Sequence, residues 1–197
     1  MSGGAPSNDA GTARREDWRR AVHVASAVLG PAALLVPPHL ARASFAALAG
    51  LAAALDLLRL ASPRTGRLVA AVAGSAFRPS ESRAPSGATA LAWGYFAAWA
   101  LFDPRFAAAA VVVAGLADPS AAWVGRRFGR GPGKTLAGSA ACATMGGLVL
   151  VAFGFSATAA LAGGLVAALA ERVPWRGVDN LLVPLAVGGA LALLGSR

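Results

Sequence analysis

Apolar residues form long runs along this chain, and short polar segments rich in Gly, Pro and Arg separate them. A helix needs about 20 largely apolar residues to cross the ~30 Å core of a bilayer, because each residue rises about 1.5 Å. Seven runs come close to this length: Ala21–Pro38, Ala41–Leu58, Gly87–Phe102, Arg105–Val124, Ala137–Phe153, Ser156–Ala170 and Val178–Leu194. The pattern predicts an all-α integral membrane protein, a bundle of about seven transmembrane helices.

The composition supports this prediction. Hydrophobic residues make up 56% of the chain and charged residues 14%, which is too apolar for a water-soluble fold. Ala and Gly are abundant, and small residues let helix backbones approach closely inside a bilayer. The single cysteine, Cys142, forms no intramolecular disulfide, and a metal cage of Cys and His ligands is excluded.

The basic residues indicate an orientation. The net charge is +9, which on a membrane protein indicates arginines facing anionic lipid head groups, so we expect no nucleic acid partner. With the N-terminus in the cytoplasm, fifteen of the 18 Lys and Arg residues fall on the cytoplasmic side, and Arg42, Arg105 and Arg197 fall outside. We expect residues 1–18 to be a disordered cytoplasmic tail and residues 19–197 to be a single polytopic membrane domain. The segment 59–86 is predicted to be an irregular cytoplasmic loop that is long enough to cover a site.

Four of the few acidic residues fall at or near the cytoplasmic boundary: Glu81, Asp118, Glu171 and Asp179. Asp118 lies within an apolar run, where an unpaired charge is costly. Pro119 lacks a backbone donor and disfavours helical geometry before it, so we expect the helix to break at Asp118. Asp118 is then either a magnesium ligand or the partner of a nearby arginine.

A loop with glycines and cations follows, from Gly125 to Thr135. Glycines let backbone amides approach phosphate oxygens, while Arg and Lys neutralise their charge. The ending Gly133-Lys134-Thr135 is similar to a P-loop, but the required first glycine is replaced by Phe128 and no strand precedes it. The loop is therefore either a triphosphate cradle of another kind or a segment that only sets topology.

Three other features could carry chemistry. Glu171 and the pair Asp179-Asn180 flank a short loop, and their oxygen atoms suit magnesium, although Asp179 could equally be a helix N-cap. His23, one turn into the first run, could act as a base, hold a phosphate or be merely solvated. Asp56 lies three residues before Arg59 on one helix face, which predicts a local ion pair.

Together these segments resemble the CTP-dependent lipid kinases, the family that includes dolichol kinase, phytol kinase and the yeast-type diacylglycerol kinase. The resemblance rests on motifs in a fixed order: Arg19-Arg20-Ala21-Val22-His23, Glu81 followed by Gly87-Ala88-Thr89, Asp118-Pro119, Gly125-Arg126-Arg127-Phe128-Gly129, Lys134-Thr135-Leu136-Ala137-Gly138-Ser139, Glu171, and Asp179-Asn180-Leu181-Leu182-Val183-Pro184. The family usually has a glycine before the central aspartate and an acidic residue before the Gly-Ser pair, where this chain has Ala117 and Ala137.

The resemblance implies transfer of the terminal phosphate of CTP to the hydroxyl of a membrane lipid: a polyprenol, a phytol-like isoprenoid or a diacylglycerol. It implies one role for each matched residue: Asp118, Asp179, Glu171 and Asn180 hold magnesium; Arg126, Arg127, Lys134 and Thr135 hold the phosphates; Gly138 and Ser139 close over them; and Glu81 or His23 acts as the base. Phosphoryl transfer consists mainly of positioning and charge neutralisation, which suits this set. The acceptor lipid and the oligomeric state stay open.

Two rival functions are a CTP-dependent phosphatidate cytidylyltransferase and a small transporter. The cytidylyltransferase would use similar carboxylates and release pyrophosphate instead of CDP. A transporter should carry its ionisable residues near the middle of the membrane, whereas the acids here gather at one face.

Overall fold

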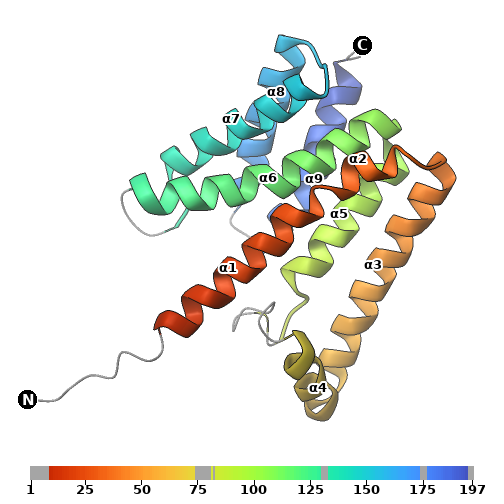
Figure 1. The fold of residues 1–197 in the computed structure, drawn as a ribbon, viewed down its shortest axis with the longest axis vertical. Coiled ribbons are helices and arrows are strands. Elements are labelled where there is room, and N and C mark those ends of the chain that lie inside the picture. Colours follow the sequence, from red (N-terminus) through yellow and green to blue (C-terminus); the bar gives the residue numbers. More distant parts are fainter. Residues whose placement is uncertain (1–8, 74–80, 82, 130–132, 174–176, 195–197) are drawn as a thin grey trace, which may run out of the picture.

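The computed structural model describes residues 9–73, 81, 83–129, 133–173 and 177–194. Over these residues the chain is helical and contains no strand (Figure 1). In chain order the helices are α1 (Asp9–Ser26), α2 (Leu29–Ala33), α3 (Pro38–Ala61), α4 (Pro63–Ala73), α5 (Gly87–Leu101), α6 (Pro104–Phe128), α7 (Leu136–Ala152), α8 (Ala157–Glu171) and α9 (Val178–Leu193).

The last six predicted runs coincide with α3 and with α5 to α9, but the first does not form one helix. Helix α1 ends at Ser26 and the short α2 follows. Pro31 has no amide to donate to the carbonyl of Ala27, and the chain there tightens into three-residue turns, with Gly30 donating to Ala27 at 3.2 Å. The prediction of a continuous helix over 21–38 is therefore wrong.

Two segments predicted to be irregular are partly helical. Helix α1 already begins at Asp9, within the segment 1–18 that composition predicts to be a tail. Within 59–86, helix α4 occupies Pro63–Ala73. The Ser62 hydroxyl accepts a hydrogen bond of 3.2 Å from the Thr65 amide, and Pro63 stands at the first helical position, which together start this helix.

Helix α6 runs without a break through Pro119, contrary to the prediction of a break at Asp118. Pro119 removes one backbone hydrogen bond, but the proline is buried, and so are Ala117 and Ala121 beside it. The Ser120 hydroxyl also donates a 2.7 Å hydrogen bond to the Leu116 carbonyl. Packing around the proline therefore holds the helical geometry that local sequence alone disfavours.

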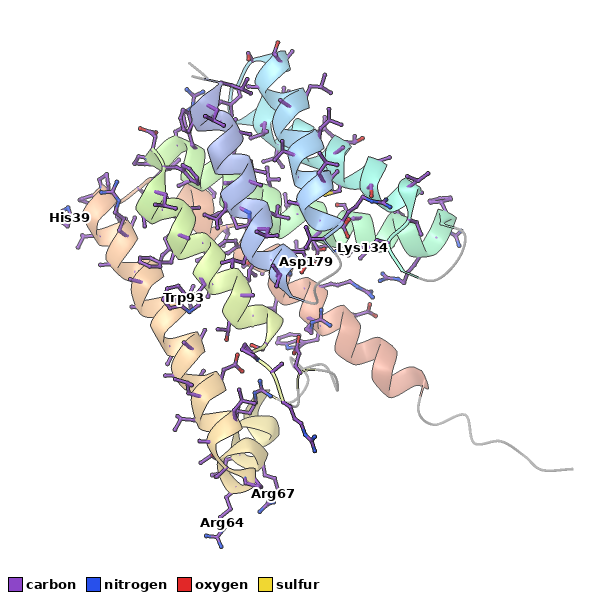
Figure 2. The ribbon with its side chains drawn as sticks, turned by 180° about the vertical axis from the view of Figure 1, so that it is seen from behind. His39, Arg64, Arg67, Trp93, Lys134 and Asp179 are labelled. Atoms are coloured by element: carbon purple, nitrogen blue, oxygen red, sulfur yellow. The ribbon has the colours of Figure 1, made fainter. Side chains whose placement is uncertain are left out.

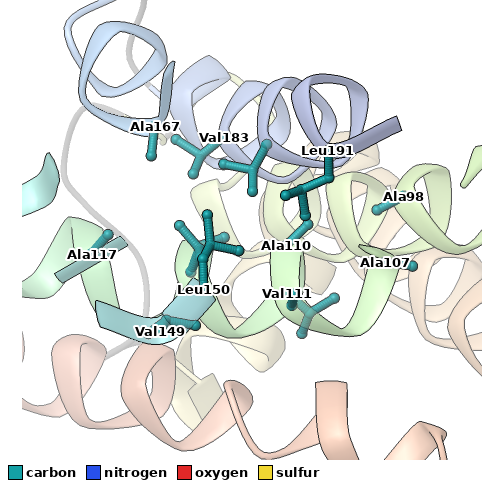
Figure 3. Packing of buried hydrophobic residues seen from close by; sticks show 14 of the residues in the cluster. Ala98, Ala107, Ala110, Val111, Ala117, Val149, Leu150, Ala167, Val183 and Leu191 are labelled. Carbon is teal, nitrogen blue, oxygen red and sulfur yellow. The ribbon is translucent and has the colours of Figure 1, made fainter. Parts of the chain in front are cut away.

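Helix α6 is the centre of the bundle, packed against α1, α2, α5, α7, α8 and α9. Its small buried residues, among them Ala110 and Val111, face Leu150, Val183 and Leu191 of the neighbouring helices (Figure 3). A methyl group added at Gly115 would lie 2.7 Å from the Ala27 side chain. Small residues thus let the helices approach to backbone contact, as expected for a helix bundle in lipid.

Among the described residues, two helices, α3 and α6, are long and apolar enough to cross a membrane. The most apolar part of α3 is 17% buried in the protein and that of α6 is 61% buried. Helices α7, α8 and α9 are apolar as well but shorter. These properties give limited support for membrane association.

Candidate functional site

Lys134 joins the ends of two helices to the segment before α7. Its ammonium nitrogen is 3.2 Å from Glu171 Oε1, at the end of α8, and 2.9 Å from Asp179 Oδ2, in the first turn of α9. It also donates to the Glu171 carbonyl oxygen. Lys134 and Asp179 lie close together in Figure 2. The structure therefore brings together three residues that the sequence assigned to one site.

The surroundings of Lys134 keep it charged. Burial by itself would lower the pKa of Lys134, but the hydrogen bond and charge of Asp179 and the charge of Glu171 outweigh it, so the pKa is raised. The pKa of Lys134 is therefore higher in the folded protein than in the unfolded chain. The stabilisation of the fold by the charged lysine and its two carboxylates is fully present below the ordinary lysine pKa. It is lost only as the pH rises through the raised value.

Asp179 is not the N-cap of α9, because Gly177 holds that position and Asp179 lies within the first turn. Its neighbour Asn180 donates a 2.9 Å hydrogen bond from Nδ2 to the Gly87 carbonyl oxygen. Glu81 approaches the same residue, since its carboxylate accepts a 3.1 Å hydrogen bond from the Gly87 amide. The starts of α5 and α9 are thus tied together beside the Lys134 cluster.

The predicted Asp56–Arg59 ion pair is confirmed, with a distance of 2.8 Å between Asp56 Oδ1 and Arg59 Nη2. Asp56 Oδ2 also accepts hydrogen bonds of 2.7 Å from the Ser86 amide and 2.6 Å from the Thr89 hydroxyl. Arg59 donates bonds of 2.7 Å to the carbonyl oxygen of Glu81 and to that of Ala84.

This buried network anchors the start of α5 and the backbone of Glu81 to α3, a role that the sequence analysis missed. The signal that could have revealed it is the pair Ser86 and Thr89 at the start of α5. A carboxylate within an apolar run, such as Asp56, needs more partners than one arginine supplies.

A cavity of about 480 Å³ lies between α6 and α7 and reaches the end of α8. Its lining contains Arg126, Gly125, Gly129, Gly133, Lys134, Thr135, Gly138, Ser139 and Glu171. The positive end of the α7 dipole, at Thr135 and Gly138, therefore adds to the charge of Lys134 and Arg126. The cavity is chemically suited to an anion.

Most glycines of this region serve helix packing. A methyl group at Gly125 would lie 3.0 Å from the Thr135 hydroxyl oxygen, and one at Gly138 would lie 2.8 Å from the Ala121 carbonyl oxygen. The Thr135 hydroxyl caps α7 by accepting a 3.1 Å hydrogen bond from the Gly138 amide. Among the described glycines of this region, Gly133, with φ of +92° and open space around it, is the one whose backbone conformation needs a glycine. The glycines thus bring the cations of α6 and the start of α7 to one cavity.

A second cavity of about 460 Å³ lies between α1 and α6, lined by Arg19, Arg20, His23, Asp118, Pro119, Ala122, Arg126 and Gly133. It adjoins the first cavity, because Ala122, Arg126 and Gly133 line both. Arg126 lines both cavities, whereas Arg127 is not among the described residues that line either one. The structure therefore separates two arginines that the sequence treats alike.

His23 is held by α6. Its Nε2 lies 3.1 Å from the carbonyl oxygen of Ala114, one turn before Asp118. A carbonyl oxygen can only accept, so Nε2 carries the hydrogen, and in the neutral ring Nδ1 is the acceptor. Asp118 lines the same cavity, and no described Arg or Lys forms an ion pair with it. The alternative of an arginine-paired Asp118 thus finds no support in the described part of the chain.

The predicted magnesium ligands are not gathered into one cluster: among the described residues no three His, Cys, Asp or Glu side chains lie close enough to hold a metal ion. Magnesium, however, commonly takes one or two carboxylates and completes its shell with water and substrate phosphates. Glu171 and Asp179 already share one cation, the Lys134 ammonium. This pair of carboxylates, beside a cavity lined by Arg126 and Lys134, fits the ligand set of a magnesium ion.

Comparison with models of protein families, with curated proteins and with solved structures gave no match to this chain. The resemblance to CTP-dependent lipid kinases stays a prediction, and the site has to be interpreted from its own geometry.

Proposed function

We propose that this chain is an integral membrane kinase that transfers the terminal phosphate of CTP to the hydroxyl of a lipid alcohol. The observation that carries the proposal is the pair of adjoining cavities, lined by Arg126 and Lys134, beside the carboxylates of Glu171 and Asp179. A polyprenol, a phytol-like isoprenoid and a diacylglycerol are the acceptor classes.

The distribution of leucines supports a lipid environment. In α8, Leu161, Leu165 and Leu169 are 67%, 50% and 68% exposed and lie on one face of the helix. The opposite face, which includes Gly164 and Ala167, is buried. In water a helix would bury its leucines, whereas in a bilayer large apolar side chains face lipid and small residues face other helices.

The proposed topology has seven membrane-crossing segments and a cytoplasmic N-terminus. Helix α3 and helices α5 to α9 supply six segments, and α1 with α2 supplies the first. Helices of 15 to 17 residues, such as α5, α7, α8 and α9, are about 22–26 Å long and cross if the bilayer thins around them. The cavities would then open to the cytoplasm, where CTP is found.

In this proposal the triphosphate of CTP occupies the cavity between α6 and α7. Lys134 and Arg126 neutralise its charge, and the first turn of α7, at Gly138 and Ser139, offers the positive end of its dipole. Asp179, Glu171, Asn180 and Asp118 are the residues that would hold magnesium, which supplies charge neutralisation between the phosphates when it is bound. The acceptor hydroxyl loses its proton to His23 or Glu81.

Substitution of the carboxylates tests this assignment. Asp118→Asn and Asp179→Asn should each lower CTP-dependent phosphorylation by on the order of 100-fold or more while the protein stays folded in the membrane. Arg64→Ala, at an exposed cation of α4, is the matched control. Near-normal turnover of either aspartate variant at saturating magnesium would remove that residue from the site.

A second candidate, the CTP-dependent phosphatidate cytidylyltransferase, gains some support from Arg19 and Arg20 in the cavity between α1 and α6. Phosphatidate carries a phosphate before the reaction, and arginines bind phosphates well. The two reactions differ in their products: the cytidylyltransferase joins CMP to the lipid and releases pyrophosphate, whereas the kinase leaves CDP.

A further inference from the structure

The cavity between α1 and α6 carries more positive charge than a neutral alcohol requires. Among the described residues that line it, Arg19, Arg20 and Arg126 carry positive charge and Asp118 carries negative charge. We propose that this cavity is the acceptor site of the proposed kinase, and that it holds the lipid hydroxyl before transfer and the lipid monophosphate afterwards. The inference rests on the proposed function and assigns this cavity a ligand class, a lipid phosphomonoester.

The charge of the ligand changes during the reaction. A lipid alcohol is neutral, whereas its monophosphate carries between about one and a half and two negative charges at neutral pH. Arg20 forms an ion pair of 2.7 Å with Asp17, whose side chain is 73% exposed. Ion pairs with such an exposed partner are weak, so a phosphate can compete with Asp17 for Arg20. The three guanidinium groups therefore favour the product over the substrate.

His23 supplies the contact that the alcohol needs. Since its Nε2 donates to the Ala114 carbonyl oxygen at 3.1 Å, Nδ1 is left as the acceptor for a hydroxyl hydrogen bond. The anchored ring cannot turn freely, which fixes the hydroxyl at one place in the cavity. Glu81 lines neither cavity, and its carboxylate binds the Gly87 amide. Of the two candidate bases, His23 thus lies in the acceptor site.

The position of the cavity also suits a lipid. Helix α1 packs mainly against α6, which leaves much of its surface open. On that surface Trp18 and Val22, one turn apart, are 55% and 48% exposed. An isoprenoid or acyl chain can lie along them while its polar end enters the cavity. Arg126, which lines both cavities, stands where the phosphoryl group would pass from CTP to the acceptor.

A photoreactive farnesyl monophosphate, with a diazirine in its first isoprene unit, tests this inference without any need for turnover. The probe is cross-linked to the purified, reconstituted protein, and the labelled peptides are identified by mass spectrometry. We expect labelling of residues in 18–27 and 114–126, and about tenfold weaker labelling of the double variant R19Q/R20Q. The double variant R64Q/R67Q, which removes two exposed arginines of α4, should label like the unchanged protein.

Competition on the unchanged protein identifies the ligand chemistry. Unlabelled farnesyl monophosphate should displace the probe at lower concentration than farnesol does, and inorganic phosphate should leave it bound. Labelling confined to 133–139 and 171 would show a nucleotide site and overturn the inference. Displacement by inorganic phosphate would overturn it in favour of a free-phosphate site. If the expected cross-links form but CTP phosphorylates no lipid, the proposed kinase activity is refuted and the lipid phosphate site stands.

Discussion

Lys134 and Asp179 lie 45 residues apart in the chain, yet a hydrogen bond of 2.9 Å joins the ammonium of one to the carboxylate of the other. Glu171 completes the cluster with a contact of 3.2 Å to the same ammonium. The contact places a cation between two carboxylates at the edge of the cavity between α6 and α7. Under the proposed function, magnesium bound with the nucleotide would supply positive charge beside these carboxylates, and Lys134 would be available to a phosphate oxygen.

Replacement of this cation should affect nucleotide use more than lipid use. Lys134→Ala should lower kcat/KM for CTP by on the order of 100-fold, because it removes a charge that stabilises the phosphates, and should leave the KM for lipid nearly unchanged. Steady-state rates measured against each substrate in turn check this. Arg67→Ala is the control. An unchanged kcat/KM for CTP in Lys134→Ala would mean that Lys134 contributes only to the orientation of the chain in the membrane.

Arg126 and Arg127 should differ in effect although they are neighbours. Arg126 lines both cavities and Arg127 lines neither. Arg126→Ala should therefore lower kcat by on the order of 100-fold, as loss of a transition-state charge does. Arg127→Ala, a surface change, should stay within about threefold of the unchanged protein. Equal losses in the two variants would contradict the separation that the structure makes.

The buried pair Asp56–Arg59 should contribute strongly to stability. Asp56→Asn removes the carboxylate that pairs with Arg59, whose side chain is 8% exposed, and breaking a buried pair in this way costs about 3–5 kcal/mol. The exposed pair Asp17–Arg20 has the same spacing, so Asp17→Asn is the matched control and should cost less than about 1 kcal/mol. Thermal unfolding in detergent measures both, and equal midpoints would refute the structural role of Asp56.

The sequence predicted most of the helices because long apolar runs with polar ends leave a membrane chain few alternatives. The sequence led to the wrong prediction of where prolines interrupt a helix. The effect of a proline depends on how its surroundings pack, and the local sequence does not contain that information. Pro31 is exposed, and the helix is interrupted just before it, whereas Pro119 is buried by neighbouring helices and α6 continues through it.

The candidate residues could be chosen from the sequence but their partners could not. Loop chemistry pointed to Lys134, Glu171 and Asp179, while their mutual contact depends on how α7, α8 and α9 pack. Likewise, adjacent arginines are equivalent in a motif until the helix turns one of them toward a cavity. The anchoring of Glu81 by Asp56 and Arg59 spans three segments, and the sequence indicates it only through the local Asp56–Arg59 spacing and through Ser86 and Thr89, which bind Asp56 at the start of α5.

The proposed topology places the two ends of α3 on opposite sides of the membrane. His39 lies at the start of α3 and Arg67 beyond its end, in α4, and Figure 2 shows them far apart. In a Cys142→Ala background, His39→Cys should react with a membrane-impermeant maleimide from outside and Arg67→Cys only from the cytoplasm. Labelling of both from the same side would refute this orientation.

The fate of the terminal phosphate of CTP tests the central claim most directly. The purified protein is incubated with magnesium, CTP labelled in its γ-phosphate, and a panel of phytol, polyprenol and diacylglycerol. The account predicts that label moves to one of these lipids as a monophosphate while unlabelled CDP accumulates in equal amount. Label released as pyrophosphate in a parallel reaction with phosphatidate, with none transferred to any alcohol, would contradict it.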